Sequence, residues 1–477
     1  MKIIAALLPL LLLCIFSFTS NAQNAPSTTL EDGGEYPAGK NDAGNPCITT
    51  QQYEAIEKQC AENIQLFGMA GAGQKTSMVT VLGWPLKAAN GLSDCSFYNI
   101  AAYVDQNTNA GAFTDFNCGT RTYDGHKGTD IAITPFGFYK MDNDQVEVIS
   151  AAGGIILDKG DGNFDRNCTA NNIPANYIII QHPDGSRALY WHLKKNSVTS
   201  KTIGQPVAAG EYLGVVGSSG SSSGPHLHFE VWSGSTADTR VDPYSGACNL
   251  LNANSWWASQ KPYSEPSVIK VSAHTTDIVL PGCPDTETPN ESNSFQLPFQ
   301  GPGLPPGAAK FYIFMRNETA GMTADVSILN PDGTVFNSWT HNSTNNYNTS
   351  WRSWTKNLPS IVGTYTLRAT YNGITCSGTF EVTNVVTKTE TLPEENPARV
   401  VPNPNTGIFT IEMSDRNGGM EWGSVEIYDL FGDRVYRSDE QSPIPVIDIS
   451  AQPRGVYFAS ISSARGKQVL KVIKTSP

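Results

Sequence analysis

The sequence predicts a mainly β protein of about three domains, built from antiparallel sheets. Two observations carry this expectation. The 477 residues include 43 glycines and 30 prolines, which divide the chain into short segments. Within many of these segments apolar and polar residues alternate, which is the period of a half-buried strand. Only one long segment has a helical period, so helices are expected to be few.

The N-terminus predicts export. Residues 1–22 combine Lys2, an apolar stretch from Ile3 to Phe18, and small residues ending at Ala22. This is the pattern of a secretory signal peptide that is cleaved after Ala22. No other stretch approaches the ~20 apolar residues of a membrane-spanning helix, so we expect no stable membrane span.

Residues 23–79 are expected to form an N-terminal segment with one helix. Gln23–Asn45 is polar and rich in Gly and Pro, which is typical of a poorly ordered stretch. Apolar residues at spacings of three and four predict an amphipathic helix over Thr50–Phe67, ending before Gly68.

Eight cysteines follow the signal peptide, and an even number in an exported chain indicates disulfides. Their spacing lacks the CxxC pairs of a structural zinc site. Cys47 and Cys60 flank or lie in the helix and can pair with each other, with Cys95 or with Cys118; the sequence alone does not fix the pairing.

Residues 80–262 contain many short strand patterns separated by Gly, Asn, Asp and Pro turns, which predicts an antiparallel sheet folded on itself. The expected strands are Thr80–Leu86, Ile100–Val104, Val146–Ser150, Gly154–Asp158, Tyr177–Gln181, Ala188–Leu193 and Tyr212–Val216.

Two motifs in this region carry metal-binding chemistry. His126-Lys-Gly-Thr-Asp130 and His226-Leu-His228 are both expected to be short strands, in which side chains two or four positions apart share a face. His192 lies between them on an apolar strand. Two imidazoles and a carboxylate form a common catalytic zinc shell that leaves a position open for water.

These motifs, with Tyr190-Trp-His192-Leu and the Gly217–Glu230 segment, resemble the signatures of the lysostaphin/LytM-type zinc endopeptidases over residues 80–262. The resemblance implies one Zn²⁺ held by His126, Asp130 and His228. His192 and His226 would be the catalytic pair that polarises water and stabilises the oxyanion. Ser223 departs from the family, which often has threonine there.

The resemblance implies hydrolysis of peptide cross-links in peptidoglycan. Two alternatives stay open: an extracellular protease that acts on glycine-rich proteins, and an inactive LytM-type scaffold that activates a hydrolase. No glutamate stands beside the ligands as in HExxH enzymes, so the histidines are expected to move the protons, with His226 as base and His192 as oxyanion donor or the reverse.

The N-terminal helix has two interpretations. It can brace the peptidase domain, or it can cover the zinc and keep the enzyme latent. Nothing in the sequence of residues 23–79 identifies a blocking residue, so we favour the brace.

Residues 267–384 predict an immunoglobulin-like β-sandwich after a short Pro-rich linker. Gly363–Val382 reads as a hairpin with Asn372-Gly373 at its turn. A Cys376–Cys283 pair is expected across the sheets. Three tryptophans are either a glycan-binding surface or part of the core: Trp339, Trp351 and Trp354.

Residues 385–398 are rich in Thr, Glu and Pro and predict a linker. Residues 399–477 consist of short alternating strands and resemble the C-terminal sorting domain of the type IX secretion system, which implies contact with that machinery and a secreted or cell-surface location. The formal net charge of −12, with no basic cluster, argues against a nucleic-acid partner.

Overall fold

A computed structural model describes most of the chain. The described ranges are 31–35, 46–69, 79–280, 283, 289–384, 398–413, 422–439, 446–463 and 466–475. The predicted signal peptide and nearly all of the predicted linker 385–398 lie outside them. The chain divides into two units, residues 1–385 and 386–477.

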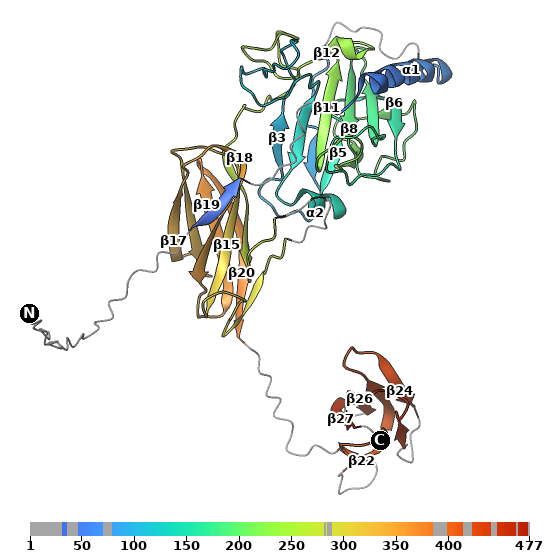
Figure 1. Cartoon of the computed structure of the whole chain (residues 1–477), viewed down its shortest axis with the longest axis vertical. Coiled ribbons are helices and arrows are strands. Elements are labelled where there is room, and N and C mark those ends of the chain that lie inside the picture. Colours follow the sequence, from blue (N-terminus) through green and yellow to red (C-terminus); the bar gives the residue numbers. More distant parts are fainter. Residues whose placement is uncertain are drawn as a thin grey trace, which may run out of the picture. The chain divides into compact units, whose positions relative to one another are not determined.

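The largest sheet of the first unit carries both predicted motifs (Figure 1). Its strands are antiparallel to their neighbours. Their order is β3 (Tyr98–Ala102), β4 (Thr129–Ile133), β11 (His226–Trp232), β8 (Arg187–Trp191), β7 (Tyr177–Gln181), β6 (Gly154–Gly160) and β9 (Pro206–Val207), with β12 (Arg240–Val241) paired to β11.

Both faces of this sheet are buried, and alternation along β11 shows how. Leu227, Phe229 and Val231 enter one apolar cluster. The residues between them point to the other face, where Trp232 joins a second cluster. A small sheet packs into the first cluster; its strands are β10 (Tyr212–Val215), β5 (Val146–Ile149) and β2 (Leu86–Ala88). A short helix, α2 (Gly137–Asp142), follows β4.

Helix α1 (Thr50–Leu66) confirms the predicted helix. Thr49 caps its start in a reciprocal capping box with Gln52, and Gly68 follows its end with a positive φ of 64°. The buried side of α1 joins the second cluster and lies beside β6, so the helix covers the face of the sheet to which the even-numbered residues of β11 point (Figure 1).

Two strand expectations were wrong. The expected strand Thr80–Leu86 is absent, because β2 begins only at Leu86 and Leu82 makes an isolated bridge to Trp257. His126 does not lie in a strand, because β4 begins only at Thr129 and the preceding residues form a turn that includes Gly125 at φ 73°. Strand periodicity therefore does not explain why His126 and Asp130 lie together; the turn brings His126 back over the start of β4.

The rest of the first unit is a β-sandwich with two sheets around one core. One sheet has the order β1 (Asp32–Glu35), β18 (Tyr347–Asn357), β15 (Ala308–Glu318) and β13 (Ser267–His274). The other has the order β14 (Ser294–Leu297), β20 (Ile374–Asn384), β19 (Gly363–Tyr371), β16 (Thr323–Leu329) and β17 (Val335–Asn342). The predicted hairpin is confirmed as β19–β20, and the architecture is consistent with an immunoglobulin-like fold.

Strand β1 corrects the expectation for the stretch before the helix. Residues 32–35 are not irregular but pair antiparallel with β18, so the N-terminal segment completes the sandwich sheet. One glycine allows the close approach, because a side chain at Gly33 would meet the Trp351 carbonyl oxygen at 2.4 Å; a side chain at Gly34 would have open space.

The disulfide pairings differ from those expected. The bonds are Cys95–Cys376, Cys118–Cys248 and Cys168–Cys283. The expected Cys376–Cys283 pair was wrong because each of these cysteines bonds a loop of the peptidase region instead. Cys47 and Cys60, which were expected to form disulfides, remain thiols.

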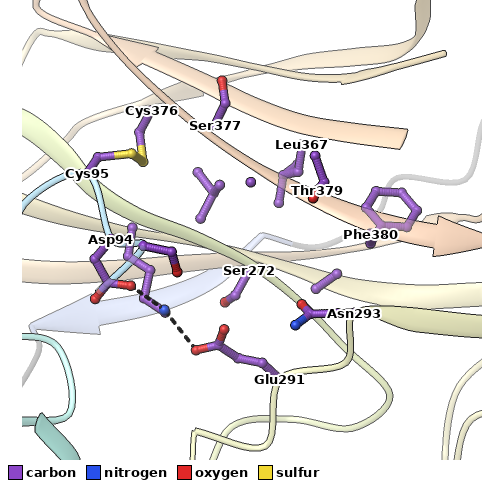
Figure 2. Close-up of a pocket in the computed structure, with 15 residues that line it drawn as sticks. Asp94, Cys95, Ser272, Glu291, Asn293, Leu367, Cys376, Ser377, Thr379 and Phe380 are labelled. Atoms are coloured by element: carbon purple, nitrogen blue, oxygen red, sulfur yellow. Dashed lines mark hydrogen bonds and ion pairs between the residues drawn. A yellow bond between two sulfur atoms is a disulfide. The ribbon is translucent and has the colours of Figure 1, made fainter. Parts of the chain in front are cut away.

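Ion pairs also join the peptidase region to the sandwich, at the boundary that the Cys95–Cys376 disulfide crosses. Asp94 accepts hydrogen bonds from Lys140 at 2.7 Å and from Lys270 of β13 at 2.5 Å. A polar cavity of about 330 Å³ lies beside these groups and the Cys95–Cys376 bond, and Figure 2 shows the residues that line it. Its lining contains none of the predicted site histidines, so this cavity belongs to the boundary between the peptidase region and the sandwich and not to the predicted site.

The tryptophans of the sandwich are mainly structural. Trp354 is buried in the core, and Trp339 packs against it with ring centroids 5.6 Å apart. Trp351 is partly buried and packs near Tyr312. The interpretation as core residues holds for Trp354, and a glycan-binding surface that includes it is excluded.

The second unit is a small β fold with its own core. Its two sheets have the orders β21 (Ala398–Val401), β22 (Ile408–Met413), β25 (Ile447–Asp448) and β24 (Arg434–Ser438), β23 (Trp422–Tyr428), β26 (Gly455–Ser463), β27 (Gly466–Lys474). Among the described residues of the whole chain, no helix has the length and apolar character needed to cross a membrane.

Candidate metal centre and active site

Three neighbouring strands place the predicted site residues on one face of the large sheet. His226, His228 and Glu230 alternate along β11 toward the side covered by α1. Asp130 of β4 is directly opposite His228 in the strand register.

His192 directly follows β8 and has a positive φ of 70°. This left-handed conformation is unfavourable for a residue with a β-carbon. It interrupts the alternation of the strand, so that Trp191 and His192 both lie on the α1 side. All five predicted site residues are thereby brought together.

The three predicted ligands converge through single atoms. His228 Nδ1 lies 2.8 Å from Asp130 Oδ1, and His126 Nε2 lies 3.2 Å from both of these atoms. His226 Nε2 lies 3.6 Å from the same Asp130 oxygen.

The hydrogen bonds of the outer ring nitrogens fix where the imidazole protons are. His126 Nδ1 donates to the Tyr103 carbonyl oxygen at 2.7 Å, and His228 Nε2 donates to Glu230 Oε1 at 2.8 Å. These acceptors carry no proton, so the nitrogens facing them must be N–H groups. In the neutral rings, His126 Nε2 and His228 Nδ1 therefore present lone pairs toward the Asp130 carboxylate.

The remaining two histidines are oriented in the same way. His192 Nδ1 donates to the Ser219 carbonyl oxygen at 2.6 Å, and His226 Nδ1 donates to the Gly224 carbonyl oxygen at 2.8 Å. Their Nε2 atoms are buried and have no hydrogen-bond partner in the described part of the chain. The two ring centroids are 4.6 Å apart.

The electrostatics of the cluster favour a positive charge at its centre. Burial raises the pKa of Asp130, but His126 and His226 outweigh this and hold it well below its usual range. Burial lowers the pKa of His126, but Asp130 prevails and the pKa is raised to about 9. Burial and the nearby His226 lower the pKa of His192. A carboxylate in a buried site thus attracts one positive charge, which a proton or a metal cation can supply.

The donor set fits a metal ion. Two imidazole lone pairs and a carboxylate oxygen lie within 3.2 Å of one another, which is mutually repulsive unless a cation lies between them. Nitrogen and oxygen ligands of this kind bind a divalent metal, and three protein ligands are typical of a catalytic site. The outer hydrogen bonds orient the ligands as in known metal sites.

Sequence reasoning missed two residues of the site. Glu230 was not expected beside the ligands, yet it is fully buried and accepts hydrogen bonds from His228, from Trp232 Nε1 at 2.9 Å and from Tyr53 of α1. Cys47, whose sequence position gave no hint of this role, offers its sulfur within 4.8 Å of the donor atoms of the three predicted ligands.

A cavity of about 700 Å³ borders the cluster on the side of the sandwich. Its lining includes Tyr123 and Asp130 from the peptidase region and Tyr347 and Asn348 from the sandwich. Asn348 also donates a hydrogen bond to the Ile100 carbonyl oxygen at 3.3 Å, so the sandwich is held next to this side of the site.

Comparison with known proteins defines the class. Residues 124–243 match the sequence model of peptidase family M23, and residues 399–475 match that of the secretion system C-terminal sorting domain. The chain therefore contains an M23 peptidase domain, which holds all five site residues, and a sorting domain that directs type IX secretion to the cell surface or the extracellular space. This confirms both resemblances predicted from the sequence.

Particular relatives share the peptidase domain. An uncharacterized metalloprotease of Buchnera aphidicola is 35% identical over 117 residues, which is 24% of this chain and 26% of that protein. The peptidoglycan DD-endopeptidase ShyA of Vibrio cholerae is 32% identical over 106 residues, 22% of this chain and 20% of that protein. The chain thus spans about a quarter or less of these relatives. The catalytic domain of lysostaphin from Staphylococcus simulans is 22% identical, with 30% of this chain and 85% of that chain covered and a TM-score of 0.20.

Proposed function

We propose that this protein is a secreted zinc endopeptidase that hydrolyses peptide bonds in peptidoglycan. The observation that carries the proposal is the convergence of four imidazoles and one carboxylate whose outer hydrogen bonds direct their unprotonated atoms to one centre. Because all five groups are present, an inactive scaffold is disfavoured.

The proposed zinc ligands are His126 Nε2, Asp130 Oδ1 and His228 Nδ1. Bound there, zinc supplies a Lewis acid that lowers the pKa of a coordinated water and polarises the scissile carbonyl. Tyr103 and Glu230 hold the two imidazoles in the tautomers that this ligation requires.

His226 and His192 are proposed to move the protons. His226 Nε2 accepts a proton from the attacking water, because its Nδ1 is committed to the Gly224 carbonyl oxygen. His192 would take up a proton from solvent at Nε2 and donate it in a hydrogen bond to the oxyanion, while Nδ1 stays bonded to Ser219. Burial lowers the pKa of His192 and so keeps it neutral in the resting site, and the developing oxyanion stabilises the imidazolium. When the C–N bond breaks, His226 passes its proton to the leaving amine. The two histidines can exchange roles.

Peptidoglycan is the proposed substrate because the similar Vibrio protein bears the name of a peptidoglycan DD-endopeptidase. The sorting domain takes the enzyme out of its own cell, so the target would be the wall of another bacterium or released wall material, with the enzyme either released or attached to the surface.

The test measures amino groups released from purified peptidoglycan by the mature chain. Cys47→Ala is used as the background, because the Cys47 thiol faces the site. We expect release with zinc, and none after chelation or after a second substitution, His228→Ala. Release of amino groups that persists in the His228→Ala protein would contradict the mechanism. Bound zinc without any release would contradict peptidoglycan as the substrate.

A further inference from the structure

The segment that precedes the peptidase domain enters the active site. Cys47 is 4% exposed, and its sulfur lies within 4.8 Å of the donor atoms of His126, Asp130 and His228. It also lies within 4.8 Å of ring nitrogens of His192 and His226. The sulfur also lies 3.0 Å from the Tyr123 hydroxyl. Cys47 thus lies between the proposed ligands and the proposed catalytic pair.

Helix α1 holds Cys47 in this position. The helix begins three residues later at Thr50, and Tyr53 on its first turn donates a hydrogen bond to Glu230, the residue that orients His228. The Tyr53 ring packs near Trp232 with centroids 6.0 Å apart, and the Lys127 Nζ atom lies over the Tyr53 ring, 4.1 Å from its centroid.

Further contacts fasten the rest of the helix to the sheet. Asn63 donates to the Leu157 carbonyl oxygen at 3.0 Å, and the Ala237 amide donates to Glu57 at 2.8 Å. Ile56 and Cys60 are buried in the same apolar cluster as the sheet residues. A packing brace explains these contacts, but it does not explain a thiol inside the histidine cluster.

The buried site supports a second role. The five site residues are only 0–5% exposed, and the Cys47 sulfur lies among their donor atoms, in the space where a scissile carbonyl would have to bind. The Nε2 atoms of His192 and His226 are buried without a hydrogen-bond partner in the described chain and belong to the group that includes the Cys47 sulfur. An attacking water would need this space.

We propose that Cys47 is a fourth ligand of the catalytic metal and that residues 46–69 form an inhibitory segment that keeps the peptidase latent. The inference rests on the proposed metal site. A cysteine thiolate is a strong zinc ligand, and a fourth protein ligand closes the position that a catalytic site leaves open for water. Activation then requires the Cys47 thiolate to leave the metal and α1 to leave the sheet.

The first test is spectroscopic and uses the full mature chain loaded with Co²⁺. A thiolate bound to cobalt gives a ligand-to-metal charge-transfer band in the near ultraviolet. We expect this band in the wild type and in Cys60→Ser, the matched control, because Cys60 is the other buried thiol and lies outside the cluster. We expect it to be absent from Cys47→Ser.

The outcomes separate the two proposals. A cobalt-loaded wild type without the band, or a band that persists in Cys47→Ser, would overturn the ligand role of Cys47 and leave the metal site intact. Failure of the wild type and Cys60→Ser to bind any metal would contradict the proposed function itself.

A second readout needs no variant. Alkylation of Cys47 in the wild type, followed by peptide mass spectrometry, should be slower with zinc than after chelation, whereas alkylation of Cys60 should respond less.

Peptidoglycan hydrolysis by Cys47→Ala should exceed that of the wild type about tenfold or more, because only the open fraction of the wild type is competent. Equal activity of these two proteins, with zinc bound to both, would overturn the latency.

Discussion

Glu230 offers a sharp test of how the ligands are oriented. This buried carboxylate accepts hydrogen bonds at Oε1 from His228 and Tyr53 and at Oε2 from Trp232. In Glu230→Gln one of the two oxygens becomes an NH₂ group, which must face a donor. If it faces Trp232, two N–H groups oppose each other. If it faces His228, the imidazole proton is driven to Nδ1, the atom that faces Asp130.

The expected loss follows from these contacts. Removing a partner that orients a ligand typically lowers metal affinity about 10–100-fold, which corresponds to about 1.4–2.7 kcal/mol. An opposed or unsatisfied donor costs a further ~1–3 kcal/mol of folding stability. Zinc affinity is measured by competition with a chromophoric chelator, and stability of the metal-free protein by urea unfolding.

Glu318→Gln is the matched control. Glu318 of the sandwich is also a buried carboxylate, and it accepts hydrogen bonds from His341 at 2.8 Å and from Arg352 at 2.9 Å. Its substitution should lower stability by a similar amount and leave zinc affinity unchanged. Unchanged zinc affinity in a folded Glu230→Gln protein would refute the proposed orienting role.

Two further predictions concern the sandwich and its attachment. Burial lowers the pKa of His274 to about 4, so this neutral imidazole binds a proton more readily in the unfolded chain. The free energy of unfolding should therefore fall as the pH drops from about 6.5 toward 4, by about 2 kcal/mol between pH 7 and 5. The urea midpoints measured at pH 7 and pH 5 should differ less in His274→Gln than in the wild type. The same difference in both proteins would contradict this prediction. After alkylation, non-reducing peptide mapping should find the Cys95–Cys376 disulfide, which joins the peptidase domain to the sandwich. It should also find Cys47 alkylated, and a disulfide at Cys47 would contradict the structure.

Local patterns in the sequence predicted much of the fold. The spacing of apolar residues gave α1, and the Asn372-Gly373 turn between two alternating stretches gave the β19–β20 hairpin. Period-two alternation also placed His226 and His228 on one face of β11. The same rule applied two residues further would have found Glu230.

Long-range contacts were beyond this reasoning. Cys47 lies 79 residues before His126 in the sequence, and no spacing rule links a thiol in one segment to a cluster in another. The Cys95–Cys376 bond spans 281 residues, and many pairings of eight cysteines are equally compatible with the sequence. His126 was placed correctly for the wrong reason, because a turn and not a strand brings it to Asp130.

X-ray absorption at the zinc edge of the full mature chain tests the central claim most directly. The proposed metal site and the proposed inhibitory segment together predict one zinc per chain with two imidazole nitrogens, one carboxylate oxygen at about 2.0–2.2 Å and one sulfur at about 2.3 Å. In Cys47→Ser the sulfur should be lost and the nitrogens kept. A chain that binds no zinc, or binds it without imidazole nitrogen, would contradict the metal centre described above.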